Sequence, residues 1–272
     1  MTIKLPMNIN LTIILPTYNE EENVAFLIPE IIEKFKLSNI DNYEILVVDD
    51  NSSDKTQDVV VGFSKQYSDV KLIARKKEPS LPLSIYDGII NSSKENIMWL
   101  DSDGSMDVDS IIKLLKKLDS DRETVFIGSR FISGGGYKGK EEFFKIPINK
   151  MLYQLIKSED SLIAIFLSLL FNKALNFLLD INVKDLTSGF ITGNKKFFNE
   201  AMFKNSVYGE YFIYVVSNLF IKNINMQEVG YFCKPRIYGE SKTSTNLIRM
   251  VSLSKPYFQA ALKSRKLINQ LK

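Results

Sequence analysis

The first half of the chain alternates short apolar segments with longer helix-compatible segments, and this alternation limits the fold more than any other feature. Apolar runs of strand length are predicted at 11–15, 43–48, 70–74, 97–100 and 124–128. Helices are predicted between them at 21–36, 55–67, 84–91 and 108–118, and Pro16 is expected to close the first strand. Strands this apolar are covered on both faces, so the pattern predicts an α/β fold with a mostly parallel central sheet flanked by helices.

Polar residues cluster directly after three of the predicted strands. The clusters are PTYNE at 16–20, DDNSSD at 49–54 and DSD at 101–103. Ligands of such sheets bind beyond the carboxyl ends of the strands, so we expect the three clusters to form one site. Asp107 precedes the helix predicted at 108–118, and we expect its side chain to cap that helix rather than to bind a ligand.

The third cluster places two carboxylates, Asp101 and Asp103, one residue apart at the end of a strand. Two such charges repel each other unless a cation lies near them or one of them is protonated. The chain has no histidine and one cysteine, Cys233, so catalytic triads that use imidazole and the usual zinc sites are excluded. A hard divalent ion, Mg²⁺ or Mn²⁺, fits a carboxylate pair and brings phosphate oxygens of a substrate as further ligands.

A D-x-D sequence alone is a weak motif, because it occurs by chance and in several classes of enzyme. Basic residues in predicted loops strengthen the case that it binds a phosphate-bearing substrate. Arg130, Arg236 and Lys242 could neutralise a diphosphate, and solvated surface charge is the alternative for each of them.

The regular alternation ends near residue 131, where a glycine-rich segment at 133–139 begins. Residues 161–179 form a long apolar segment in which Ser168, Asn172 and Asn176 make a narrow polar stripe at helical spacing. The segment approaches the ~20 residues that cross a bilayer, but Asn172 and Lys173 lie inside it. We therefore expect a helix that lies on an interface or docks on the protein, with a helix buried in a soluble core as the alternative. After DLTSGF at 185–190, a helical segment is predicted through Phe220, and a strand is predicted around 226–232.

The carboxyl-terminal segment is basic although the net charge of the chain is only +3. Residues 242–272 contain no acidic residue and seven basic ones: Lys242, Arg249, Lys255, Lys263, Arg265, Lys266 and Lys272. A solvated helix face fits this composition, and so does attraction to an anionic membrane surface or a phosphate ligand. The single cysteine favours a reducing, cytosolic setting, and residues 1–10 lack an apolar core of signal-peptide length, so export is not expected.

Six segments of the chain, in this order, resemble family 2 glycosyltransferases of the GT-A fold, with greatest similarity to the dolichyl-phosphate mannosyltransferase branch. They are LTIILPTYNEEEN, YEILVVDDNSSDKTQ, WLDSDGS, IGSRF, DLTSGF and RIYGESK. The opening motif and the D-x-D are widespread among such transferases, whereas RIYGESK is more specific to those that act on polyprenyl phosphates. The resemblance implies a GT-A domain over 1–242, with an interface helix at about 143–180, and a basic amphipathic helix over 243–272.

The resemblance also implies roles for individual residues. The donor nucleoside would be held by Pro16, Tyr18, Glu20, Val48 and Asp50. Asp101, Ser102 and Asp103 would bind the donor and the metal, with Asp103 as the main carboxylate ligand and Ser105 nearby as a further metal ligand. Arg130 would face the diphosphate or the acceptor phosphate and, with Asp103, would be catalytic; Arg236 and Lys242 would come from a loop that closes over the donor.

Two departures from the family pattern are visible. Relatives usually carry a glycine-rich turn where this chain has SLPLS at 80–84. Relatives often carry an acidic residue where this chain has Tyr214, and Glu210 lies one turn earlier.

The function implied by the resemblance is inverting, metal-dependent transfer of a hexose, in the first place mannose from GDP-mannose, to a polyprenyl or dolichyl phosphate. The protein would act at the cytoplasmic face of a membrane, as a peripheral or monotopic protein with a possible membrane-anchoring subunit, and would not bind nucleic acid. One alternative is a UDP-glucose donor or a glycan hydroxyl acceptor; a hydroxyl acceptor needs a general base, Glu210 or Asp185. A second alternative, from another class, is a non-catalytic subunit of a glycosylation complex.

Overall fold

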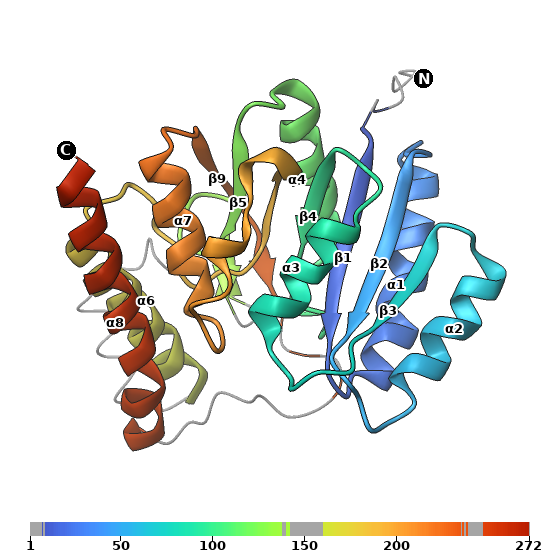
Figure 1. The fold of residues 1–272 in the computed structure, drawn as a ribbon, viewed down its shortest axis with the longest axis horizontal. Helices are drawn as coiled ribbons and strands as arrows, with labels where there is room; N and C mark the ends of the chain where they lie inside the picture. The colour runs from blue at the N-terminus through green and yellow to red at the C-terminus, as the bar shows by residue number, and fades with distance from the viewer. Residues whose placement is uncertain are drawn as a thin grey trace.

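The structure is a computed structural model that describes residues 7, 9–137, 140–141, 160–234, 236, 238 and 247–271. Its centre is a seven-stranded sheet with the strand order β3-β2-β1-β4-β8-β5-β9 (Figure 1). The strands are β1 Leu11–Thr17, β2 Tyr43–Asp49, β3 Val70–Ala74, β4 Asn96–Trp99, β5 Val125–Ser129, β8 Ile191–Asn194 and β9 Met226–Gly230. Every pairing in this sheet is parallel except those of β8, which runs antiparallel to β4 and to β5. The predicted α/β fold with a mostly parallel sheet is confirmed.

Two details of the sheet differ from the prediction. Strand β8 was not predicted, since a helical segment was expected between residue 190 and Phe220. Its four residues carry no alternation and take their conformation from pairing with β4 and β5. Strand β1 was expected to stop before Pro16 but continues to Thr17. Thr17 O accepts a hydrogen bond from Asp50 N on the β2 side, so the missing N–H of Pro16 faces the β4 side, where pairing ends at Ile14.

Helices cover both faces of the sheet, and each face has its own hydrophobic core (Figure 1). Helices α1 (Glu21–Leu37), α2 (Thr56–Gln66) and α4 (Val108–Ser120) pack on one face. Helices α3 (Leu81–Asn91) and α7 (Tyr211–Ile221) pack on the other, around the fully buried Trp99. Two short 3-10 helices, Lys195–Phe197 and Glu200–Met202, connect β8 to α7. Asp107 caps α4 as predicted, since its Oδ1 accepts from Ser110 N at 2.9 Å.

A buried carboxylate, Glu44 on β2, ties three parts of the sheet together at the edge opposite the polar clusters. It accepts hydrogen bonds from Thr12 Oγ1 at 2.6 Å, Ser93 N at 2.7 Å and Lys71 Nζ at 2.8 Å. Burial alone would raise the pKa of Glu44, but the hydrogen bonds from Lys71, Thr12 and Ser93 outweigh it and lower that pKa to about 2.

Helices α6 (Asp160–Leu179) and α8 (Leu247–Leu271) form a pair beside α7, at the left of Figure 1. The ring of Phe171 contacts Tyr257 and Phe258 edge to face, and Arg265 donates to Leu179 O at 3.1 Å. Of the interface helix expected at 143–180, the structure describes the part from residue 160 onward. Of the helix expected at 243–272, it describes residues 247–271, and the remaining residues of both segments lie outside the described ranges. Across the part of the chain that the structure describes, no helix combines the length and the apolar character needed to span a bilayer.

The segment after β5 takes part in a small second sheet. Its strand order is β10-β6-β7, with β6 at Gly136–Tyr137, β7 at Lys140–Glu141 and β10 at Phe232–Cys233. This sheet brings the residues that precede Arg236 next to those that follow β5.

Candidate active site

A cavity lies at the carboxyl ends of β1, β2 and β4, where all three predicted polar clusters meet. The described residues that line it are Pro16, Thr17, Tyr18, Glu20, Asp50, Pro79, Ser80, Leu81, Ser84, Asp101, Ser102, Asp103, Val207, Tyr208 and Arg236. The expected convergence of the clusters is therefore confirmed.

The first wall of the cavity consists of two loops that hold each other. Asn19 takes the left-handed backbone conformation, with φ at 55°, and its Oδ1 accepts from Ser53 N at 2.8 Å. Ser52 Oγ accepts from Asn19 N at 2.9 Å, and Thr56 Oγ1 accepts from Glu20 N at 2.9 Å. The loops after β1 and β2 are thereby fixed to each other, and they present Tyr18 and Glu20 to the cavity.

The two adjacent acids after β2 have different surroundings. Asp49 accepts from Ser52 N at 3.0 Å and from Gln57 Nε2 at 2.7 Å, which stabilises the turn after the strand. Asp50 borders the cavity, and its carboxylate accepts from Arg75 Nη1 and from Ser80 N. Asp49 is therefore a turn residue, and Asp50 is the acid of this pair that borders the cavity.

The acidic pair after β4 forms the floor of the cavity. Ser102 Oγ donates to Pro16 O at 2.8 Å, which fixes the turn against β1. Asp103 Oδ1 accepts from Ser105 N at 2.9 Å, and its Oδ2 lies 2.8 Å from Arg236 Nε. Burial, reinforced by the negative charge of Asp103, raises the pKa of Asp101 to about 7, although Arg236 acts in the opposite direction.

The charges around the cavity favour a cation. Of the described lining residues, Glu20, Asp50, Asp101 and Asp103 are acidic and Arg236 is basic, so a diphosphate would meet excess negative charge unless a cation came with it. Within the described ranges, no cluster of three or more acidic or cysteine side chains is arranged to enclose a metal ion. Two carboxylates that leave other positions to water and phosphate oxygens are the usual protein contribution to Mg²⁺ or Mn²⁺ bound with a nucleotide, and the Asp101–Asp103 pair fits this pattern.

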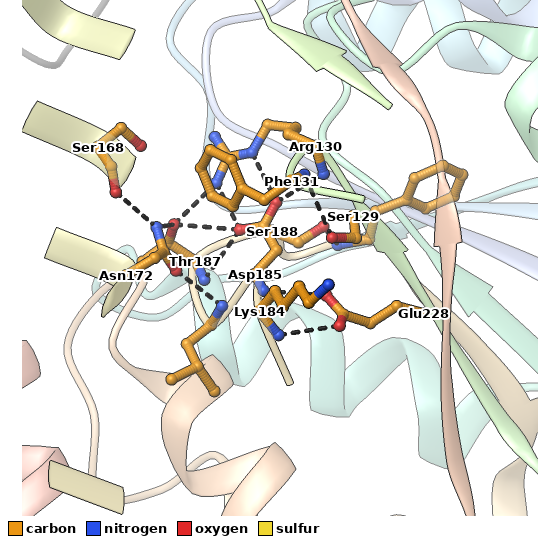
Figure 2. A network of polar contacts seen from close by, with 12 residues as sticks. Ser129, Arg130, Phe131, Ser168, Asn172, Lys184, Asp185, Thr187, Ser188 and Glu228 are labelled. Carbon is orange, nitrogen blue, oxygen red and sulfur yellow. Dashed lines mark hydrogen bonds and ion pairs between the residues drawn. The ribbon is translucent and has the colours of Figure 1, made fainter. Parts of the chain in front are cut away.

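Arg130 is buried and pairs with an acid instead of lining the cavity (Figure 2). Its Nε lies 2.8 Å from Asp185 Oδ2 and its Nη2 lies 2.7 Å from Asp185 Oδ1, a bidentate ion pair. Nη2 also donates to Thr187 Oγ1 at 2.7 Å. Arg130 is not among the described residues that border the cavity, and its predicted contact with a phosphate remains a prediction.

The same network holds helix α6 against the domain (Figure 2). Asn172 Nδ2 donates to Thr187 Oγ1 at 3.0 Å, and Asn172 Oδ1 accepts from Leu186 N at 2.8 Å. Glu228 accepts from Lys184 N at 2.9 Å and from Asp185 N at 3.0 Å. The polar stripe that the sequence places on α6 therefore serves, at Asn172, to dock the helix.

Two further predicted site residues, Val48 and Ser105, are described by the structure and do not border the cavity. The side chain of Val48 is buried in the core beside Ile14. Ser105 lies next to Asp103 but does not border the cavity, and Lys242 lies outside the described residues. Glu210, one of two candidate general bases, folds back onto its own loop and accepts from Val207 N at 2.7 Å and from Tyr208 N at 3.1 Å.

Several lining residues were not predicted as site residues. Ser80, Leu81 and Ser84 belong to the segment that departs from the glycine-rich pattern, and that segment still reaches the cavity. Val207 and Tyr208 precede α7 and have exposed side chains at the rim of the cavity. Arg75 does not border the cavity itself, but it follows β3 at the same edge of the sheet as the three polar clusters, and this position is the signal in the sequence that points to it.

Known proteins resemble this chain in both sequence and fold. The sequence model of the family described as Glycosyl transferase family 2 matches residues 12–201. A dolichyl-phosphate beta-glucosyltransferase of Trichomonas vaginalis is 26% identical over 159 residues, or 56% of this chain and 46% of that protein. A dolichol-phosphate mannosyltransferase of Pyrococcus furiosus is 35% identical over 124 residues, or 46% of this chain and 34% of that protein. The matches span less than half the length of these two curated relatives.

A solved structure supports the fold over almost the whole chain. Glucosyl-3-phosphoglycerate synthase from Mycobacterium tuberculosis, solved with Mn²⁺, uridine diphosphate and glucosyl-3-phosphoglycerate, superposes with a TM-score of 0.61 at 15% identity. The superposition covers 95% of this chain and 81% of that chain.

Proposed function

Because the chain belongs to glycosyl transferase family 2, we propose that it transfers a hexose from a nucleoside-diphosphate sugar to the phosphate of a polyprenyl carrier such as dolichyl phosphate. The observation that carries this proposal is the cavity itself. Its acidic floor, Asp101 and Asp103, lies beside the two interlocked loops that present Tyr18, Glu20 and Asp50. The curated relatives named above act on dolichyl or dolichol phosphate, which supports the choice of acceptor.

In the proposed reaction a phosphate oxygen of the acceptor attacks the anomeric carbon of the donor. The new carbon–oxygen bond forms as the bond to the nucleoside diphosphate breaks, and the diphosphate leaves with the electron pair, so the configuration at the carbon is inverted. No proton has to be removed from the acceptor, because its phosphate is already an anion. The tasks left to the protein are positioning and stabilisation of charge on the leaving group.

Residues of this chain divide these tasks. Asp101 and Asp103 would hold Mg²⁺ or Mn²⁺, which when bound neutralises charge on the departing diphosphate. Arg236, which borders the cavity beside Asp103, would add a second positive charge there. Tyr18, Glu20 and Asp50 would orient the nucleoside.

The alternative acceptor, a glycan hydroxyl, finds less support. It requires a carboxylate that can take a proton from the hydroxyl, and Glu210 and Asp185 were the candidates. The carboxylate of Glu210 is engaged by backbone N–H groups of its own loop, and that of Asp185 is engaged by Arg130. A non-catalytic subunit is also less well supported, since it has no need for two carboxylates and a buried charge network around a cavity.

We further propose that helices α6 and α8 rest on a membrane surface, where a polyprenyl phosphate resides. Phe177 on α6 is 87% exposed and lies one turn after the exposed Lys173. Helix α8 exposes Lys255, Lys263 and Lys266 and contains no acidic residue. Exposed apolar and basic side chains together suit the surface of an anionic bilayer.

The test is release of nucleoside diphosphate from GDP-mannose and from UDP-glucose, each with Mg²⁺ or Mn²⁺, with and without a polyprenyl phosphate. We expect one of the two donors to release its nucleoside diphosphate, and we expect the polyprenyl phosphate to stimulate this release. Release that is equal without the lipid phosphate, or that depends on a glycan instead, would contradict the proposed acceptor. The donor that turns over decides between mannose, expected from the sequence, and glucose.

A further inference from the structure

Arg75, the first residue after β3, is a buried cation that joins two acids. It is 5% exposed. Its Nε donates to Asp87 Oδ2 at 2.7 Å, and its Nη1 donates to Asp50 Oδ1 and to Ser84 Oγ, the latter at 3.1 Å. Asp50 and Ser84 border the cavity, whereas Arg75 is not among the described residues that do.

The second oxygen of Asp50 is held by the segment that precedes α3, which also borders the cavity. Ser80 N donates to Asp50 Oδ2, and Ser80 O lies 3.5 Å from Arg75 Nη1. The neighbouring residues Pro79 and Leu81 also border the cavity, and Leu81 begins α3. One guanidinium therefore connects Asp50, the segment 79–81 and the first turn of α3.

These contacts explain how the segment 79–84, which lacks the glycine-rich turn, keeps a defined shape beside the cavity. Pro82 lies in the first turn of α3, where its fixed φ suits a helix and its missing N–H costs nothing. The segment before it has no regular structure, and the hydrogen bonds to Asp50 and Arg75 fix its backbone. A buried guanidinium is costly unless it is paired, so with Asp50 and Asp87 present the pairing holds the whole segment in place.

We infer that Arg75 is a positioning residue of the nucleoside subsite, which holds Asp50 and the wall at 79–84 in the shape that receives the nucleoside of the donor. The inference rests on the proposed function, because it takes the cavity as the donor site. A carboxylate that is already held in one orientation accepts a hydrogen bond from a nucleoside N–H or O–H without losing further rotamer freedom. Arg75 acts through Asp50 and Ser80, so its loss affects donor binding and not the transfer step.

The test measures binding of UDP and of GDP, each with Mn²⁺, by calorimetry, together with kcat and KM for the donor. For Arg75→Met we expect the dissociation constant of the preferred nucleotide and the KM to rise about tenfold or more, the loss of one charge-assisted hydrogen bond. We expect kcat to change by less than about threefold. Asp50→Asn should weaken binding as well, and adding Arg75→Met to it should cost little more, because the two residues act as a unit.

The matched control is Lys71→Met. Lys71 on β3 forms an ion pair with Glu44 on β2, with Nζ 2.8 Å from Glu44 Oε2, at the end of these strands that lies away from Arg75. The nucleotide affinity of Lys71→Met should stay within about twofold of wild type, because this substitution alters no group near the cavity. If Arg75→Met does not fold, Arg75→Lys replaces it, since a lysine keeps the charge but cannot reach both acids, and affinity should fall about threefold or more.

The outcomes separate the inference from the proposed function. Wild-type nucleotide affinity in folded Arg75→Met or Arg75→Lys would overturn the positioning inference and leave the proposed function intact. Failure of the wild-type protein to bind either nucleotide would overturn the donor site on which both rest. A fall in kcat without a change in affinity would also overturn the inference.

Discussion

Replacement of Asp185 by Asn tests how strongly the buried ion pair beside the cavity holds the fold together. Asp185 is fully buried, and its carboxylate accepts from Arg130 Nε, Nη2 and N at 2.8, 2.7 and 3.0 Å. Asparagine keeps one acceptor oxygen but removes the negative charge that faces the Arg130 guanidinium, in a residue that is 8% exposed. Breaking a buried pair on one side costs about 3–5 kcal/mol of unfolding free energy.

The measurement is urea unfolding of wild type and Asp185→Asn, followed by circular dichroism, with thermal unfolding beside it. At about 2–4 °C per kcal/mol for a chain of this size, the midpoint temperature should fall by about 6–20 °C. Glu123→Gln is the control, because Glu123 pairs with Lys196 at the surface and such pairs contribute about 0–1 kcal/mol. Adding Arg130→Met to Asp185→Asn should recover part of the loss, since the buried positive charge that faced Asp185 is then removed as well. A loss below about 1 kcal/mol in Asp185→Asn would refute this reasoning.

Two further substitutions test the packing of the sheet. Glu44→Gln should reduce the unfolding free energy at pH 7 by about 1.5–3 kcal/mol, because it removes a buried, hydrogen-bonded charge. The pKa of Glu44 in the folded protein, about 2, lies below its ordinary value of 4.5, so this stabilisation is complete above pH 4.5 and is lost as the pH falls toward 2. Unfolding curves at several pH values should therefore show the unfolding free energies of the two proteins converging at low pH. A difference that stays constant with pH would contradict the lowered pKa of Glu44. Gly230→Ala should lower the unfolding free energy by about 1–3 kcal/mol in the same assay, because a Cβ there would lie 2.5 Å from the backbone at 133–134. An unchanged unfolding free energy would show that the backbone at 133–134 can move away from the added methyl group without cost.

Much of the fold could be predicted from the sequence because its signals are local. Apolar runs bounded by turn residues placed five strands and the helices between them, and the acidic clusters after three strands marked the edge where the cavity lies. The cap at Asp107 follows from one residue before an amphipathic segment, and it is confirmed. Such features depend on a few neighbouring residues, which a single sequence displays.

Features that depend on distant pairing could not be predicted in the same way. Strand β8 is four residues long and takes its conformation from β4 and β5. The pairing of Arg130 with Asp185 joins residues 55 positions apart, so an arginine expected to face a phosphate was found beside an acid whose burial no local pattern shows. The role of Arg75 depends on distant residues in the same way, because its partners Asp50 and Asp87 come from different elements.

The most direct test of the account is formation of the glycolipid product itself. Purified protein is incubated with the nucleotide sugar, a polyprenyl phosphate and Mn²⁺, and the lipid fraction is analysed by mass spectrometry, with Asp103→Asn as the matched variant. We predict that wild type forms a polyprenyl-phosphate hexose and that folded Asp103→Asn forms at least about a hundredfold less, since it loses a carboxylate that acts on the leaving group. No glycolipid from wild type with either donor, or equal amounts from both proteins, would contradict the account.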